Sequence, residues 1–209
     1  MKKITLIVAL LLAAFVAKAQ DDRSGFKLEL DLGAVQYTNW SALSVFDDGM
    51  INQTYGLINS DRLIIGYRGN KGIYGGIGIG YEKGNAPQFK EEFLHINIIG
   101  DFKYYYRLTD RFDLVEGLEF QYIIGKNRFE FLNKDYDVNH NGWTFALNLG
   151  VNFNITDDQY VGIKASWPCL GGMDKSDLPS EVTSSELASK NTRTDLYGYR
   201  IGLTWGITF

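Results

Sequence analysis

The 209-residue sequence is poor in the residues on which many active sites depend, with one cysteine, two histidines and three prolines. The single cysteine, Cys169, excludes an intramolecular disulfide and a metal site built from several thiolates. His95 and His140 are the only histidines available to a His-dependent active site. The formal net charge of −4 lacks the basic excess that nucleic-acid-binding proteins usually carry, so no nucleic-acid partner is expected.

Long hydrophobic runs are also missing, except at the N-terminus. Lys2 and Lys3 precede an apolar run over residues 4–16, and a small-x-small site ends at Ala19, which is the pattern of a secretory signal peptide. The run is shorter than the roughly 20 residues of a membrane-spanning helix. We therefore predict a signal peptide over residues 1–19 and one domain over residues 20–209, with an uncleaved N-terminal helix as the alternative. Without residues 1–19 the chain has 18 basic and 25 acidic residues, a formal charge of −7.

Alternation of apolar and polar residues dominates the rest of the chain. Two clear cases are WTFALNLGVNFNI, residues 143–155, and YGYRIGLTWGITF, residues 197–209. A period of two indicates a β-strand, because successive side chains point to opposite faces of a sheet. Strands of soluble domains usually have about five or six residues, whereas a strand that crosses a bilayer needs roughly 9 to 11. The length therefore favours strands with one face in lipid, which in the absence of apolar helices requires a closed barrel.

Eight segments show this alternation, and the connections between them differ in length. The segments are residues 25–34, 62–68, 72–81, 94–106, 112–124, 143–155, 160–167 and 197–209. Short turn sequences, GNKG, LTDR and TDDQ, follow the second, fourth and sixth segments, whereas residues 41–56, 82–91, 126–141 and 169–194 are predicted to be long loops. Short periplasmic turns and long extracellular loops are typical of bacterial outer-membrane barrels. The sequence thus predicts an all-β, eight-stranded antiparallel up-and-down transmembrane β-barrel.

Aromatic residues gather near the ends of these segments, as expected for girdles at the two membrane interfaces. We expect Trp40, Tyr81, Trp143 and Trp167 near the long-loop rim, and Tyr67, Tyr106, Phe112, Phe153 and Phe209 near the short-turn rim.

The last segment carries a more specific pattern. Arg200, Gly202, Trp205, Ile207 and Phe209 resemble the C-terminal assembly signal of outer-membrane β-barrel proteins. Together with the predicted leader and strands, the chain resembles the small eight-stranded outer-membrane barrels of the porin-like, OmpA/OmpX type. The resemblance implies location in the bacterial outer membrane, contact with outer-membrane lipid, insertion by the barrel assembly machinery and a monomeric state without a cofactor. No peptidoglycan-binding segment follows Phe209, so anchoring to the cell wall is not implied.

The inward-facing positions carry balanced charge. Within each segment, the residues that alternate with the apolar ones are expected to face the interior. These positions include four acidic and four basic residues, namely Glu29, Asp31, Arg68, Asp101, Lys103, Glu119, Lys164 and Arg200. An eight-stranded barrel is just wide enough for its own side chains to fill it. Because an unpaired buried charge is costly, we expect a polar network of salt bridges rather than an open conduit. A narrow gated pore is the alternative.

Catalytic and metal sites have little support. His140, Ser166 and Asp137 form a loose Ser/His/acid set that no spacing supports, and we expect no catalytic residues. Residues 133–142 resemble part of a calcium loop through Asp135, Asp137, Asn139 and Asn141, but the closing bidentate Glu is absent. A polar hairpin tip explains the same residues, so no metal site is predicted, although the sequence leaves this open.

Two functions of different classes remain. The first is a non-enzymatic integral outer-membrane protein with a structural or surface-interaction role, whose long loops contact a host surface, a phage or polysaccharide. The second is a secreted or periplasmic soluble β-barrel that carries a small apolar ligand. The soluble carrier requires the apolar face inside the barrel, whereas the membrane protein requires it outside.

Overall fold

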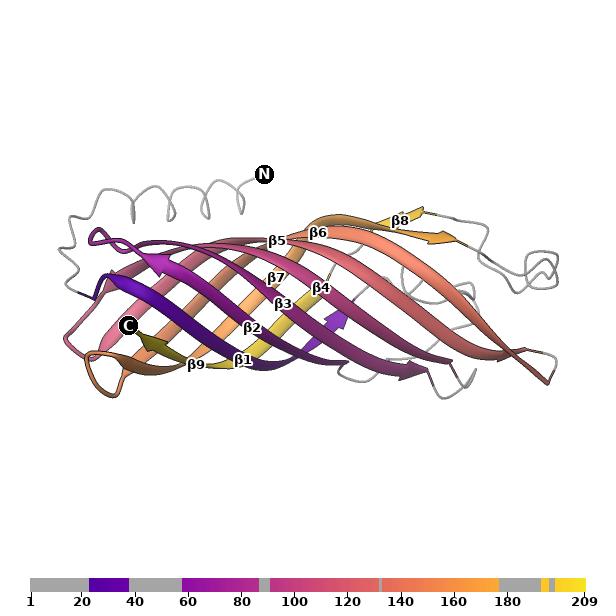
Figure 1. The fold of residues 1–209 in the computed structure, drawn as a ribbon, viewed down its shortest axis with the longest axis horizontal. Coiled ribbons are helices and arrows are strands. Elements are labelled where there is room, and N and C mark those ends of the chain that lie inside the picture. Colours follow the sequence, from indigo (N-terminus) through magenta and orange to yellow (C-terminus); the bar gives the residue numbers. More distant parts are fainter. Residues whose placement is uncertain (1–22, 38–57, 87–90, 132, 177–192, 196–197) are drawn as a thin grey trace, which may run out of the picture.

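The computed structural model describes residues 23–37, 58–86, 91–131, 133–176, 193–195 and 198–209, and nearly all of them are β-strand (Figure 1). The strands are β1 (Gly25–Tyr37), β2 (Ile58–Arg68), β3 (Ile73–Ala86), β4 (Glu91–Arg107), β5 (Phe112–Phe131), β6 (Lys134–Asn154), β7 (Gln159–Ser176), β8 (Arg193–Asp195) and β9 (Gly198–Thr208). Within these ranges no helix is long and apolar enough to cross a membrane. The predicted signal peptide and Trp40 lie outside the described residues.

The strands close into one barrel. Each strand from β1 to β7 pairs antiparallel with the next, β7 pairs with β9, and β9 returns to pair with β1. The closed barrel therefore has eight antiparallel strands in up-and-down order, as predicted. The short strand β8 adds three residues to the edge of β7, where Gly172 is opposite Asp195.

Three tight turns lie at one end of the barrel, which also holds the C-terminus (Figure 1). In the β2–β3 turn Gly72 adopts a φ of 79°, in the left-handed region that glycine tolerates best. In the other two turns the hydroxyls of Thr109 and Thr156 accept hydrogen bonds from the backbone N–H groups of Phe112 (3.1 Å) and Gln159 (3.0 Å). These side-chain hydrogen bonds explain why short Thr/Asp-rich sequences suffice to reverse the chain.

At the opposite end, the predicted bounds of the second, third and fourth long loops were wrong, whereas the first, residues 41–56, lies outside the described residues. Strand β3 continues to Ala86, β7 reaches Ser176, and β5 and β6 are joined directly at residues 132–133, so the third loop is a hairpin. Asn133, with a φ of 59°, lies at its tip. In β3, β5 and β6 the outward residues beyond the predicted ends are polar, as at Lys83, Lys126 and Asn141. Backbone pairing continues beyond the lipid because inter-strand hydrogen bonds do not depend on apolar side chains.

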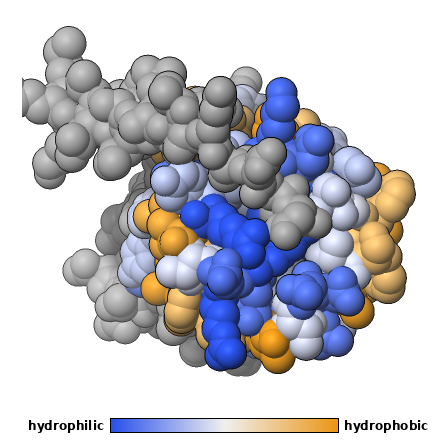
Figure 2. All heavy atoms as spheres, turned by 90° about the vertical axis from the view of Figure 1, so that its left-hand side faces the viewer, coloured by the Kyte–Doolittle hydropathy of each residue, from blue (hydrophilic) through white to orange (hydrophobic). Residues whose placement is uncertain are grey.

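The apolar face of the barrel is on the outside. Large apolar side chains such as Ile77, Phe102 and Leu203 are 70%, 62% and 65% exposed, whereas charged residues such as Asp31 and Arg200 are fully buried inside. Viewed from the short-turn end, hydrophilic residues occupy the centre and hydrophobic residues lie at the periphery (Figure 2). This is the reverse of what a soluble carrier of an apolar ligand requires.

Aromatic pairs mark both edges of the apolar band. Trp143 stacks on Phe120 with ring centroids 6.4 Å apart, and Phe112 packs against Phe153 at 5.2 Å near the short turns. On β6, Trp143 and Phe153 delimit eleven residues. A tilted strand needs roughly 9 to 11 residues to cross the hydrocarbon layer, so the two girdles fit one bilayer.

The outward orientation can be tested with one charge. Replacing Ile77 by Arg puts a cation near the middle of the lipid-facing side of β3, and we expect a loss of about 2–4 kcal/mol in the free energy of unfolding from lipid. Asn85→Arg, on the same face but beyond Tyr81, should cost about 0–1 kcal/mol. Denaturant titration in vesicles measures both. Equal effects of the two variants would contradict the assignment of the apolar band to lipid.

Candidate functional site: a closed polar interior

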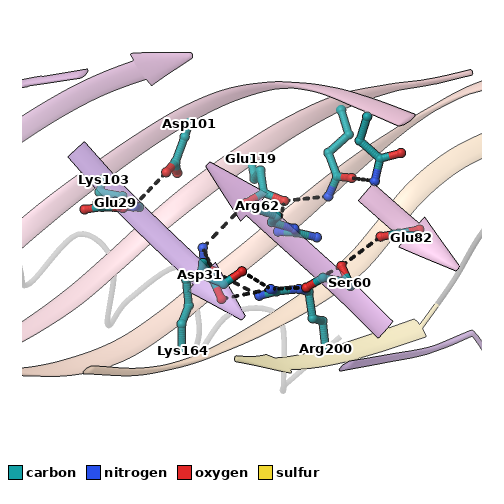
Figure 3. A network of polar contacts seen from close by, with 12 residues as sticks. Glu29, Asp31, Ser60, Arg62, Glu82, Asp101, Lys103, Glu119, Lys164 and Arg200 are labelled. Carbon is teal, nitrogen blue, oxygen red and sulfur yellow. Dashed lines mark hydrogen bonds and ion pairs between the residues drawn. The ribbon is translucent and has the colours of Figure 1, made fainter. Parts of the chain in front are cut away.

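The interior is organised around Asp31 on β1. Its carboxylate accepts two hydrogen bonds from the Arg200 guanidinium, at 2.8 and 3.0 Å, and lies 2.6 Å from Lys164 Nζ (Figure 3). Arg200 also donates to the Ser60 hydroxyl (3.0 Å) and carbonyl (2.7 Å). Two-point Arg–carboxylate pairs fix geometry as well as charge. Because Asp31 and Arg200 lie on β1 and β9, this pair connects the strands that close the barrel.

Two facing glycines make room for the Asp31–Arg200 pair. Gly33 and Gly202 are directly opposite each other on β1 and β9. A Cβ on Gly202 would lie 2.1 Å from Asp31 Oδ1, and one on Gly33 would lie 2.6 Å from Arg200 Nη2. The glycines therefore occupy positions where any side chain would displace the ion pair.

A second cluster surrounds Glu29, two residues from Asp31 on the same inward face. Its carboxylate receives hydrogen bonds from Lys103, Tyr105 and Tyr160. Lys103 also lies 2.7 Å from Asp101. One carboxylate thus joins strands β1, β4 and β7.

Further pairs extend the network toward both ends. Arg62 contacts Glu119 at 2.6 Å, and Glu119 lies 3.9 Å from Lys164, which links this pair to Asp31. Toward the long-loop end, Glu82 accepts hydrogen bonds from the hydroxyls of Ser60 (3.0 Å) and Tyr37 (2.9 Å). Toward the short-turn end, Asp113 pairs with Arg68 at 3.1 Å and with Arg23 at 3.3 Å.

All eight charged residues predicted for the interior lie inside the barrel and are buried. Five further charged residues that the sequence prediction does not include are also buried inside: Arg23, Lys27, Arg62, Glu82 and Asp113. Asp113 and Arg62 already have the inward parity of their predicted strands, so parity alone could have found them. Glu82 was missed because it was assigned to a loop.

Clusters of apolar and aromatic side chains pack among the members of the charged network. On the long-loop side a cluster of buried side chains comprises Val35, Tyr37, Ile58, Phe93 and Ile123. On the short-turn side another comprises Ile64, Tyr74, Tyr105 and Val115. The two clusters place bulky side chains inside the barrel toward both ends of the described lumen.

The catalytic set considered from sequence does not assemble. His140 lies in strand β6 rather than in a loop, and its side chain is buried inside, whereas Asp137 faces outward and pairs with Lys126 at 2.7 Å. Ser166 is inside but in register with Asn148, eight residues from His140 along β6. Eight strand residues span about 26 Å, so Ser166 and His140 cannot exchange a proton directly.

The calcium-loop resemblance fails for a related reason. Asp135, Asp137, Asn139 and Asn141 all belong to the extended strand β6, where side chains on one face are separated by about 7 Å per step. Calcium ligands must all reach within about 2.3–2.6 Å of one ion, which requires a folded loop. Across the described residues, no three His, Cys, Asp or Glu side chains are grouped so that they could hold a metal ion.

The five residues that resemble an assembly signal lie along β9 and, in the case of Phe209, directly after it, and they occupy both faces. Arg200 and Gly202 face the interior, whereas Trp205 is 41% exposed on the lipid face. Ile207 is partly exposed, and Phe209 is 75% exposed with its backbone N–H bonded to the Phe26 carbonyl at 2.8 Å. The terminal ring therefore extends from the barrel rather than packing within it.

Comparison with known families agrees with this architecture. The model of the outer membrane protein beta-barrel domain matches residues 5–168, more than three quarters of the chain. The chain belongs to this family of outer-membrane β-barrel proteins. It is accordingly a protein of the bacterial outer membrane, where the apolar band faces lipid. None of the curated proteins compared with the chain matched it by sequence.

Solved outer-membrane barrels share the fold at low sequence identity. Neisserial surface protein A is 14% identical, with a TM-score of 0.53 over 89% of this chain and 98% of its own. The outer membrane protein AlkL, solved in lipid bilayers, is 10% identical, with a TM-score of 0.55 over 93% and 94%. OprG from Pseudomonas aeruginosa is 12% identical, with a TM-score of 0.51 over 91% and 99%. At these identities the likeness establishes the fold alone.

Proposed function

We propose that this protein is a non-enzymatic outer-membrane barrel that presents an extracellular surface for interaction, with the β5–β6 hairpin as its main element. The observation that carries the proposal is the contrast between a filled interior and a long external projection. Ion pairs and two clusters of bulky side chains occupy the described lumen, which argues against transport as the main role. The hairpin instead extends past the neighbouring strands (Figure 1).

The geometry of the hairpin suits a presented surface. Strands β5 and β6 have 20 and 21 residues, but β4 pairs with β5 only up to Arg128, and β7 pairs with β6 only up to Asn139. Among the described residues the tip is therefore two-stranded, and Asn133, Lys134 and Asp135 are exposed there. Asp137 braces it by pairing with Lys126 (2.7 Å) and Arg128 (3.1 Å) on the other strand. Projections held by a rigid scaffold are where binding usually resides.

Surface labelling tests the location of the hairpin. In a Cys169→Ser background, we expect Lys134→Cys at the tip to react with a membrane-impermeant maleimide on intact cells. Asp158→Cys, in a short turn, should react only after the outer membrane is permeabilised. Reaction of both positions, or of Asp158→Cys alone, in intact cells would contradict the proposed orientation and with it the role of the hairpin.

A further inference from the structure

Three basic side chains lie together on the outside of the barrel, just beyond the aromatic girdle of the long-loop end. Lys83 follows Tyr81 on the outward face of β3, and Lys126 and Arg128 lie on the outward face of β5. In the strand register Lys83 is opposite Leu94, and Leu94 is opposite Lys126. One row across three strands thus holds two lysines about 10 Å apart, with the arginine one step further from the membrane.

These side chains border a surface hollow of about 210 Å³. The membrane-side lining is apolar and includes Tyr81 and Leu94, whereas the outer lining holds the three bases together with Glu92 and Asp137. The change from apolar to charged lining occurs where a lipid changes from acyl chain to head group. We call Lys83, Lys126 and Arg128 the basic row.

The acids beside the basic row neutralise it only in part. Asp137 accepts hydrogen bonds from Lys126 (2.7 Å to Nζ) and Arg128 (3.1 Å to Nε), which hold the pKa of this carboxyl below its usual range. The bond to Arg128 uses Nε alone, and Lys83 forms no ion pair with any described residue. Three bases and two acids, Glu92 and Asp137, line the hollow, so its lining has a formal charge of 3 − 2 = +1 in a protein whose overall net charge is −4. Glu92 is directly opposite Arg128, and Asp135 acts on Arg128 from outside this lining.

We propose that the basic row binds the phosphorylated head group of an outer-leaflet lipid, whose acyl chains run down the outward face of β3 and β4. Three arguments support this occupant. The row faces lipid rather than the lumen, it lies just beyond Tyr81 at the depth of lipid phosphates, and its charge is complementary to a phosphate. Basic residues near an anionic membrane surface contribute about 1 kcal/mol each to attraction, so three of them suffice to select anionic lipids.

The arrangement also assigns a role to Asp137. Its carboxylate holds Lys126 and Arg128 side by side but competes with a phosphate for both. Removing this charge by Asp137→Asn should therefore strengthen binding of a phosphorylated lipid. A purely structural hairpin brace would predict no gain.

Native mass spectrometry of the full barrel in detergent tests the proposal, with lipid A carrying two phosphates as the probe and its dephosphorylated form as the comparison. We expect the triple variant with Lys83, Lys126 and Arg128 replaced by Gln to bind the phosphorylated lipid about tenfold more weakly than wild type. The matched control replaces Lys71, Arg107 and Arg111 by Gln. It removes the same charge at the opposite rim and should bind as wild type does.

Heat-modifiable migration on gels verifies that each variant is folded. If the triple variant does not fold, the single variant Lys83→Gln is used for the binding measurement instead. Equal binding of phosphorylated and dephosphorylated lipid would overturn the proposal, as would wild-type binding by the triple variant. Loss of lipid binding in millimolar inorganic phosphate but not in chloride of the same ionic strength would also overturn it, because the site would then recognise a free anion rather than a lipid. Tighter binding by Asp137→Asn would support it.

Discussion

Replacing Asp31 by Ala is expected to destabilise the barrel more than any other single substitution in the interior. Asp31 is fully buried and neutralises both Arg200 and Lys164. Its removal leaves two buried cations without their main partner, and breaking a buried ion pair in this way typically costs about 3–5 kcal/mol. The free energy of unfolding from lipid vesicles, or the midpoint of the heat-induced gel shift, measures the loss.

The neighbouring strand provides a matched control. Asp61 on β2 faces outward, with no ion pair among the described residues, and Asp61→Ala should change the free energy of unfolding by no more than about 0.5 kcal/mol. The double variant of Asp31→Ala with Arg200→Ala should lose less than the sum of the two single losses, because the second substitution removes one unpaired cation. Additive losses would show that the pair does not act as a unit.

The fold could be predicted from the sequence because a bilayer and a narrow lumen impose opposite demands on alternate residues. Segments such as residues 143–155 therefore show a period of two for their full membrane-crossing length, and their faces were assigned correctly. The signal disappears where both faces become polar. For this reason the sequence predicts a loop over residues 126–141, which includes His140, whereas these residues continue β5 and β6 and the His140 side chain is buried inside the barrel.

The sequence predicts which charged residues face the interior, but it does not predict which of them form ion pairs with each other. Parity places Asp31 and Arg200 inside, but whether they meet depends on the closure of β1 against β9, between residues 169 positions apart. The stagger of strands in a barrel is a global property that no local pattern encodes. Two glycines in the sequence, Gly33 and Gly202, each lie two residues from a member of the pair. In the folded barrel they are opposite each other and make room for the Asp31 and Arg200 side chains.

The second large effect is expected at Phe209, where stability and assembly should separate. The terminal ring is 75% exposed and its backbone bond to Phe26 does not depend on the side chain, so Phe209→Ala should change the free energy of unfolding in vesicles by less than about 1 kcal/mol. In cells, by contrast, we expect the variant to lose most of its outer-membrane level, because we propose that the assembly machinery reads this residue. Immunoblots of outer-membrane fractions measure that level.

Phe26→Ala separates recognition from general loss of an aromatic side chain. Phe26 belongs to the same rim, is 61% exposed, and packs edge-on against Tyr67 with centroids 5.3 Å apart. Its removal should cost at least as much stability as Phe209→Ala, yet leave the outer-membrane level near wild type. If the outer-membrane level drops equally for both variants, Phe209 acts only as an aromatic anchor at the membrane interface. The assembly signal must then lie within β9 itself. If Phe209 contributes little to the stability of the folded barrel but much to its level in the outer membrane, the assembly machinery must bind this residue before the barrel closes.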